Sequence, residues 1–203
     1  GGVDYMSYIV PGLIMMSVIT NAYGNVSSSF FGNKFQRSVE EMMVAPVYPI
    51  TILAGYVAGG VARGVAVGII VTLLSLYFTD LQVHNLGVMA AVVLLSAILF
   101  SIGGFINAVF ATKFDDIAIV PTFIITPLTY LGGVFYSISL LPDFWQGVSQ
   151  LNPILYMVNT FRYGVLGVSD IHIGFAFAML FVFIFILGGY SIWLLRRGTG
   201  MRQ

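Results

Sequence analysis

Long apolar runs, separated by short stretches that hold nearly all of the charged residues, dominate the pattern of this chain. Each run has roughly 20 residues, the length that an α-helix needs to cross a bilayer core about 30 Å thick. No water is available at that depth, so every backbone amide must be satisfied within the segment, which favours helices. The pattern predicts five membrane-spanning helices, over residues 8–31, 57–78, 86–111, 117–135 and 175–195.

The composition supports the same fold class, an all-α membrane protein that forms a polytopic helical bundle in a single domain over residues 1–203. Hydrophobic residues make up 59% of the chain and charged residues only 8%, whereas roughly a quarter of the residues of a soluble domain are charged. So few charges cannot cover a water-exposed surface. The formal net charge is +0, so nothing favours nucleic acid as a partner, and the absence of cysteine excludes disulfides.

The basic residues are distributed unevenly among the gaps between the predicted spans. With five spans, six of the eight basic residues lie on one side of the membrane: Lys34, Arg37, Lys113, Arg196, Arg197 and Arg202. By the positive-inside rule that side is cytoplasmic, so the C-terminus is expected in the cytoplasm. The membrane is then the inner, or plasma, membrane. Gly1 then begins outside. We therefore expect one further span upstream, giving six helices in the full-length protein.

The gap after the first span is predicted to hold a short cytoplasmic helix over residues 38–46. Ser38 and Glu41 match a capping box, in which the two side chains satisfy free backbone donors at a helix start. Pro46 and Pro49 limit the helix to about two turns, because proline lacks the N–H and clashes with the preceding turn.

This short helix has an apolar side and a charged frame. The apolar side is formed by Val39, Met42 and Met43. Methionine adapts its shape readily, so this side suits a groove on a partner protein, framed by Arg37, Glu40 and Glu41. The alternative interpretation is an amphipathic helix that lies on the bilayer surface.

The gap over residues 136–173 is too long for a turn and too apolar for a solvated loop. Pro142 and the Asn152-Pro153 step interrupt it. We predict short re-entrant helices on the extracytoplasmic side that cap or line a cavity, because irregular backbone at membrane depth is tolerated only against protein or water. The alternative is an aromatic belt at the membrane surface.

Polar residues are sparse within the predicted spans. Candidates for a substrate pathway are Asn21, Asn107, Thr122 and Thr126. Pro121 and Pro127 loosen the fourth span, where threonine hydroxyls can bond the freed carbonyls. No intramembrane acid or histidine chain appears, as a pump driven by protons or sodium would require, so the energy source is expected on another subunit.

The second span combines recurring glycines with one charge. Glycine at positions 55, 59, 60, 64 and 68 allows another helix to approach closely. Arg63 lies about two turns above the predicted start of the span. A charge that deep is costly; the insertion cost at mid-membrane is roughly 3 kcal/mol. We expect it to extend towards the cytoplasm or to pair with an acid there; a role in a pathway is the alternative.

Motifs for enzyme chemistry are missing from the sequence. There is no Gly-x4-Gly-Lys-Ser/Thr nucleotide loop and no His-Glu-x-x-His, and His84 and His172 stand apart from other ligands. Gly-x-Ser triplets at Ser149 and Ser169 lack the structural context of a nucleophile. We predict no catalytic residue, metal site or cofactor on this chain, and so no enzyme activity of its own.

Residues 152–163, Asn-Pro-Ile-Leu-Tyr-Met-Val-Asn-Thr-Phe-Arg-Tyr, followed by Gly164 and Leu166-Gly167, resemble the signature of type-2 ABC exporter permeases. The likeness extends to Phe135-Tyr136, Leu141-Pro142, Trp145 and the segment Ala45-Pro46-Val47. It covers essentially the whole chain.

The resemblance implies a homodimeric export channel driven by two copies of a separate ABC ATPase, which binds ATP and Mg²⁺. The residues that would couple the channel to the ATPase are Arg37, Ser38, Glu40, Glu41, Met42, Met43 and Pro46. Those that would shape the outer gate or the re-entrant fold are Pro142, Trp145, Asn152, Pro153, Tyr156, Phe161 and Arg162.

Two other functional classes use similar architectures. A membrane assembly subunit would have this fold without moving a substrate. A secondary transporter should show an internal repeat, and no convincing repeat is found in the sequence. The substrate stays open among lipids, lipid-linked glycans, polysaccharide and amphipathic drugs.

Overall fold

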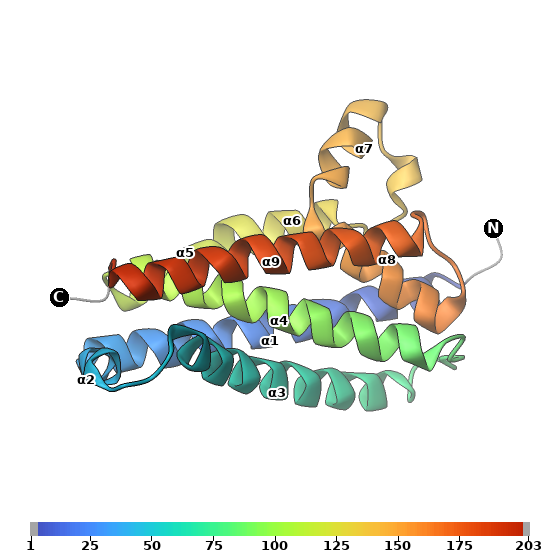
Figure 1. Cartoon of the computed structure of the whole chain (residues 1–203). Coiled ribbons are helices and arrows are strands. Elements are labelled where there is room, and N and C mark those ends of the chain that lie inside the picture. Colours follow the sequence, from blue (N-terminus) through green and yellow to red (C-terminus); the bar gives the residue numbers. More distant parts are fainter. Residues whose placement is uncertain (1–3, 201–203) are drawn as a thin grey trace.

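Helices account for every regular element in the computed structural model of the chain, which describes residues 4–200 (Figure 1). Gly1 and Arg202, which entered the orientation argument, lie outside the described residues. The elements in chain order are α1 (Tyr5–Phe35), α2 (Ser38–Val44), α3 (Pro49–Ser75), α4 (Leu86–Phe110), α5 (Phe114–Val120), η1 (Pro121–Ile125), α6 (Thr126–Leu131), η2 (Ile138–Leu140), α7 (Asp143–Gln150), α8 (Pro153–Leu166) and α9 (Ile173–Arg197).

Five helical segments between residues 4 and 200 are long and apolar enough to cross a membrane. They are α1, α3, α4, the continuous segment Phe114–Leu131 and α9. This confirms the all-α class and the five predicted spans. The re-entrant region predicted over residues 136–173 contains short helices, as expected, in η2, α7 and α8.

The second span begins earlier than predicted, at Pro49 rather than at residue 57. Proline was treated as a helix breaker, yet Pro49 is the first residue of α3. At that position its missing N–H would have had no partner in the helix, and its fixed φ suits the first turn. Arg63 consequently lies in the middle of α3 and not two turns from its start.

Close packing of α1, α3 and α4 builds the centre of the bundle. The glycine face predicted on the second span serves this packing. A Cβ atom at Gly60 would collide with Ser101 and Val26, and one at Gly64 would lie 3.0 Å from the Cβ of Ala22. Small residues therefore let α3 approach both α1 and α4.

The fourth span departs from α-helical geometry at its two prolines. Residues Pro121–Ile125 form one π-helical turn, η1. Ile117, four residues before Pro121, loses its backbone donor, and the Asn107 side chain donates to that carbonyl at 3.2 Å. The Thr126 hydroxyl donates to the Pro121 carbonyl at 2.9 Å. The prediction that threonine hydroxyls bond the freed carbonyls is therefore wrong here: an asparagine of α4 bonds the freed Ile117 carbonyl, and the Pro121 carbonyl also accepts from the Thr126 amide.

The bundle has two ends of different construction, called here the α2 end and the α8 end. The α2 end holds α2, the α4–α5 connection and the end of α9 (Figure 1). The α8 end holds α8 and the α3–α4 connection, and α1 begins near it, at Tyr5 (Figure 1). From the bundle close to α8, η2 and α7 project outwards (Figure 1).

Candidate functional site

The short helix at the α2 end follows α1 after only two residues. Arg37 joins the helices in a left-handed conformation, with φ of 61°, and its carbonyl accepts from the Glu40 amide at 3.1 Å. Ser38 is the first helical residue and no side chain caps the helix, so the predicted capping box of Ser38 and Glu41 is wrong. Arg37 stands at the N-cap position, and the turn of its backbone starts the helix without a side-chain cap. The predicted start and length of about two turns are confirmed, although α2 ends at Val44 and Pro46 follows it.

One face of α2 is anchored in the bundle. Val39 is only 2% exposed and packs in an apolar cluster with Phe31, Leu53 and Val109, among others. Met42 and Met43 are half-buried against the same cluster. Val39 is therefore not available to a partner, and the two methionines are available only in part, because the bundle covers the apolar side that was predicted to face a partner groove.

The other face of α2 is charged and open. Arg37, Glu40 and Glu41 are exposed, and so is the chain that follows, where Val44 is 88% and Tyr48 is 78% exposed. This surface, with Ser38 and Pro46 at its ends, brings together five of the seven residues predicted to couple to an ATPase, whereas Met42 and Met43 lie on the inner side. It combines carboxylates with apolar side chains, as a protein-binding surface does.

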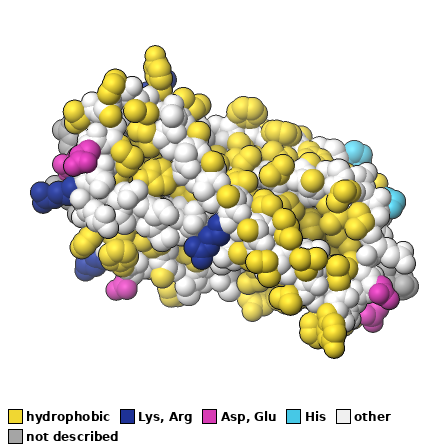
Figure 2. Space-filling model, turned by 90° about the horizontal axis from the view of Figure 1, so that it is seen from below, with side chains coloured by type: hydrophobic (Ala, Val, Ile, Leu, Met, Phe, Trp, Pro, Cys, Tyr) yellow, Lys and Arg dark blue, Asp and Glu magenta, His cyan; other side chains and the backbone are white. Residues whose placement is uncertain are grey.

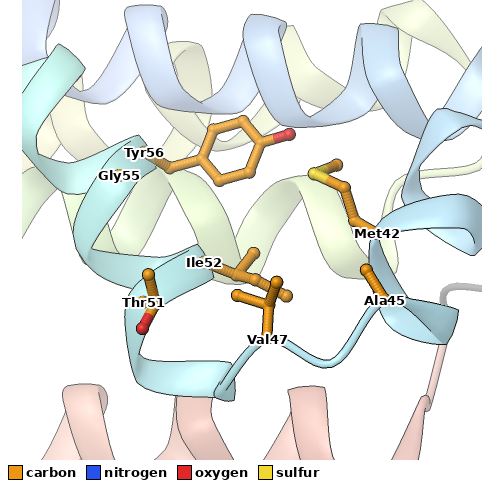
Figure 3. A pocket seen from close by; sticks show the side chains of 7 residues that line it. All are labelled: Met42, Ala45, Val47, Thr51, Ile52, Gly55 and Tyr56. Carbon is orange, nitrogen blue, oxygen red and sulfur yellow. The ribbon is translucent and has the colours of Figure 1, made fainter.

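A cleft of about 370 Å³ lies beside α2 (Figure 3). Met42 and Tyr56 enter it from α2 and α3, respectively (Figure 3). The Tyr56 hydroxyl accepts a hydrogen bond from Asn33 at 2.6 Å, and its ring packs edge-on against Phe30 with centroids 5.2 Å apart. The full lining is Met42, Ala45, Val47, Thr51, Ile52, Gly55 and Tyr56. The cleft is apolar, and its wall at Tyr56 is held in place from α1.

Lys34 secures the end of α1 that carries α2. Its side chain is buried, and the Nζ atom donates to the carbonyls of Val109 and Ala111, both at 2.8 Å. These carbonyls lie at the C-terminal end of α4, where helix carbonyls lack intrahelical partners and favour a cation. Sequence reasoning counted Lys34 only as a cytoplasmic charge. A lysine in the last turn of an apolar helix was the one available signal for this role.

Arg162 is a buried cation at the α8 end, as Lys34 is at the α2 end. Its guanidinium is buried and donates to the carbonyls of Gly133 at 2.7 Å, Val134 at 3.3 Å and Tyr8 at 3.3 Å. It also stacks over the Tyr8 ring at 3.8 Å. Burial lowers the pKa of Arg162, and the negative charge of Asp170 opposes that shift. Arg162 thus joins α8 to α1 and to the turn after α6.

The Asn152-Pro153 step starts α8 and attaches it to α6. The Asn152 side chain accepts from the Ile154 amide at 3.0 Å and donates to the Leu128 carbonyl in α6. Proline follows at the first helical position. A backbone N–H at that position has no partner within the helix, so the N–H that proline lacks is not missed. Asparagine is one of the preferred N-cap residues, so this cap was within reach of sequence reasoning.

The seven signature residues divide into two groups in the structure. Five pack within or at the start of α8: Asn152, Pro153, Tyr156, Phe161 and Arg162. The Tyr156 hydroxyl donates to the Gln150 carbonyl, which closes the turn between α7 and α8. Pro142 and Trp145 lie apart, at the start of the projecting α7, where Trp145 is 45% exposed.

The four pathway candidates do not form one cluster. No hydrogen bond links any two of them within residues 4–200. Asn21 donates to the Ser17 carbonyl of its own helix at 3.0 Å, and Asn107 and Thr126 serve carbonyls of the fourth span. Thr122 is exposed on η1. Local backbone bonding accounts for Asn107 and Thr126, and a pathway role of the four stays a prediction.

Known proteins are similar to this chain over the regions described above. The family model described as ABC-2 type transporter matches residues 1–166, which reach to the end of α8. The inner membrane transport permease YadH of Escherichia coli (strain K12) is 59% identical over 204 residues, covering 100% of this chain and 79% of that protein. Nodulation protein J of Rhizobium meliloti (strain 1021) is 24% identical over 197 residues, covering 97% of this chain and 75% of that protein.

Proposed function

The chain belongs to the ABC-2 type transporter family, and on that premise we propose that it is the permease subunit of an ATP-driven exporter. Two copies of this chain would form the substrate path, and two copies of a separate ATPase would bind ATP and Mg²⁺. The absence of a nucleotide-binding loop from the 203 residues supports this division of labour. The five apolar helices and the name of the Escherichia coli relative support a place in the inner membrane.

The α2 end is the cytoplasmic end in this proposal. Basic residues gather there: Lys34, Arg37, Lys113, Arg196 and Arg197. Positively charged loops are retained in the cytoplasm during insertion, so this distribution supports the orientation. Figure 2 shows basic side chains at that end and histidines at the other. The ATPase would therefore approach α2, with the C-terminus on the same side.

The observation that carries the proposal is the two-sided construction of α2. Its inner face is held by Val39 in the same apolar cluster as residues of α1, α3, α4 and α9, while Glu40 and Glu41 point outwards. A force applied to α2 by a partner would therefore pass to α1, its main neighbour, and through the shared apolar cluster to α3, α4 and α9. The exposed carboxylates suit basic side chains of an ATPase, which would steer its docking.

The α8 end is suited to be the outer gate. Arg162 and Asn152 hold α8 against α1 and α6 by directional bonds to backbone carbonyls. Such bonds resist sliding more than apolar contacts do, so α8 would move together with those helices when the bundle rearranges.

Co-purification of the full-length protein with its candidate ATPase tests the proposal. We expect the native protein to form a stable complex that stimulates ATP hydrolysis, and the double variant Glu40→Arg/Glu41→Arg to lose both. Asp143→Arg is the matched control, because Asp143 is also an exposed acid but lies on α7 near the opposite end. A Glu40→Arg/Glu41→Arg protein that binds and stimulates the ATPase normally would rule out the coupling role of α2.

A further inference from the structure

Arg63 is a charged residue in the middle of a membrane-spanning helix. At 1.5 Å per residue it lies about 21 Å from Pro49 and about 18 Å from Ser75, the two ends of α3. An arginine side chain spans neither distance, so the expected extension towards the cytoplasm does not bring the charge to water. The side chain is exposed on the surface of the bundle. Figure 2 shows a basic side chain midway along this face, with the other charged groups at the two ends.

No counter-charge is available to Arg63 in the chain. It makes no hydrogen bond or ion pair with any residue between 4 and 200. The acids of the sequence all lie at the ends of the bundle or in its connections: Asp4, Glu40, Glu41, Asp80, Asp115, Asp116, Asp143 and Asp170. A second copy of these 203 residues therefore offers no acid at that depth either. A mid-membrane charge is costly unless it is compensated, so its counter-ion must come from outside these 203 residues, either from the expected upstream span or from a bound molecule. Only a bound molecule makes ligand affinity depend on Arg63.

Two asparagines of α1 lie on the same side as Arg63. A Cβ atom at Gly59 would lie 3.4 Å from the amide nitrogen of Asn25. Arg63 follows Gly59 by one turn on α3, and Asn21 precedes Asn25 by one turn on the antiparallel α1. Arg63 and Asn21 therefore share one layer, with Asn25 one turn nearer the α2 end.

The remaining polar side chains of this α1 face are already satisfied. The hydroxyls of Ser17, Thr20 and Ser28 each donate to a carbonyl of α1 itself. The Asn25 amide, in contrast, makes no hydrogen bond within residues 4–200, and Asn21 uses only one of its donors. On this face, the donors without a partner among the described residues are thus those of the Asn21 and Asn25 amides and of the Arg63 guanidinium beside them.

An apolar track continues from Arg63 towards the α8 end. Ile70 and Leu74 follow it by two and three turns on the same side of α3 and are 56% and 62% exposed. The face therefore offers cationic and amide donors at one level and bare hydrocarbon above it. This arrangement matches a molecule with an anionic head and an apolar tail.

We propose that Arg63, Asn21 and Asn25 form a mid-membrane site for the phosphate or carboxylate head of an anionic amphiphile that the protein moves, with the tail along Ile70 and Leu74. The guanidinium would bind two oxygens of the head at once, and the two amides would bind the others. Low dielectric at this depth strengthens such bonds. The inference rests on the proposed permease function and specifies its substrate class.

The test measures binding by the full-length protein in phosphatidylcholine nanodiscs, without ATPase or nucleotide. The probes are oleoyl lysophosphatidate and monooleoylglycerol, which share the acyl chain and differ in the phosphate. We expect native protein to bind the lysophosphatidate at least about tenfold more tightly, since a bidentate charged contact contributes roughly that factor or more. Arg63→Gln should abolish the preference, and Arg63→Lys should keep part of it.

Arg197→Gln is the matched control, because Arg197 is an exposed basic residue at the α2 end. An unchanged preference in Arg63→Gln would overturn the proposal, as would a loss of preference in Arg197→Gln alone. Displacement of the lysophosphatidate by inorganic phosphate at equal concentration would assign the site to a free anion and overturn the amphiphile. Thermal unfolding of each variant confirms that the fold is retained.

ATPase association, measured on the same preparations, separates this inference from the proposed function. Arg63→Gln should still bind the ATPase, because Arg63 lies far from α2 along α3. A protein that shows the phosphate preference but binds no ATPase would retain the head-group site and refute the exporter. Normal ATPase binding without a phosphate preference would refute the site alone.

Discussion

A buried cation donates hydrogen bonds to backbone carbonyls at each end of the bundle, but the two cations join different numbers of segments. Arg162 at the α8 end donates to carbonyls from two segments, α1 and the turn after α6, and stacks on Tyr8. Lys34 at the α2 end donates only to the end of α4. Beside Lys34 an apolar cluster carries α2, and the charged groups of α2 face outwards.

The difference shows how one helical bundle combines a fixed region with an adaptable one. Directional bonds to carbonyls define a single geometry for α8, because each carbonyl that loses its donor becomes an unsatisfied buried group. Apolar packing around α2 has no such angular requirement, so α2 can shift while it stays in contact. A permease driven by an ATPase at the α2 end, as proposed above, would use this asymmetry.

Loss of the Arg162 guanidinium should have the largest effect on stability. Arg162→Leu leaves the carbonyls of Gly133 and Val134 without their donor, and each unsatisfied buried group costs about 1–3 kcal/mol. We expect a loss of about 3 kcal/mol in the free energy of unfolding, measured by denaturant titration in detergent. Arg162→Lys, which keeps a donor and the charge, should recover part of it. Equal stability of the Leu variant and the native protein would contradict the fixed-end interpretation.

Loss of the Lys34 ammonium should have a smaller effect, because it serves carbonyls at one helix end. Lys34→Met keeps most of the side-chain volume but removes both hydrogen bonds, and we expect it to cost about 2 kcal/mol. Hydrogen exchange should rise over residues 108–113, where α4 ends. Arg197→Met, an exposed basic residue at the same end, should leave exchange there unchanged.

Truncation of the α2 anchor should cost less again. Val39→Ala removes two buried methyl groups, worth about 1.6 kcal/mol at 0.8 kcal/mol each. The effect should be local, seen as faster exchange of α2 and weaker ATPase association with the spans intact. Val44→Ala is the control of identical chemistry on the 88% exposed side of α2, and it should leave exchange unchanged. Similar exchange in the two variants would show that α2 is not anchored by its inner face.

Charge reversal on the outer face should barely change stability. Glu41→Arg alters an exposed residue, so the free energy of unfolding should move by no more than about 0.5 kcal/mol. Transport should nevertheless be abolished and dimer assembly retained, if this carboxylate meets the ATPase. Transport at the native rate in reconstituted vesicles would separate α2 from coupling.

Prolines show how far local rules reach in this chain. Pro153 and Asn152 begin α8, and Pro121 frees the Ile117 carbonyl, as local chemistry predicts. Pro49 was misjudged, because a proline ends one helix and begins another by the same geometry, and only the following residues decide between these outcomes. The predicted capping box at Ser38 failed for a related reason, since Arg37 turned the backbone directly from α1 into α2.

The sequence by itself determined the five spans, the short helix of α2, the helical region over residues 136–173 and the family. These follow from hydropathy, prolines and motif residues within one or two turns of each other. Only the tertiary structure decided where the charges end up. Arg162 bonds to Tyr8, 154 positions away, and Lys34 to Val109, 75 positions away, because a charge buried by folding takes whichever carbonyls packing brings to it. Arg63 has no hydrogen-bond or ion-pair partner within residues 4–200 for the same reason: packing brings no acid of this part of the chain to its level of the membrane.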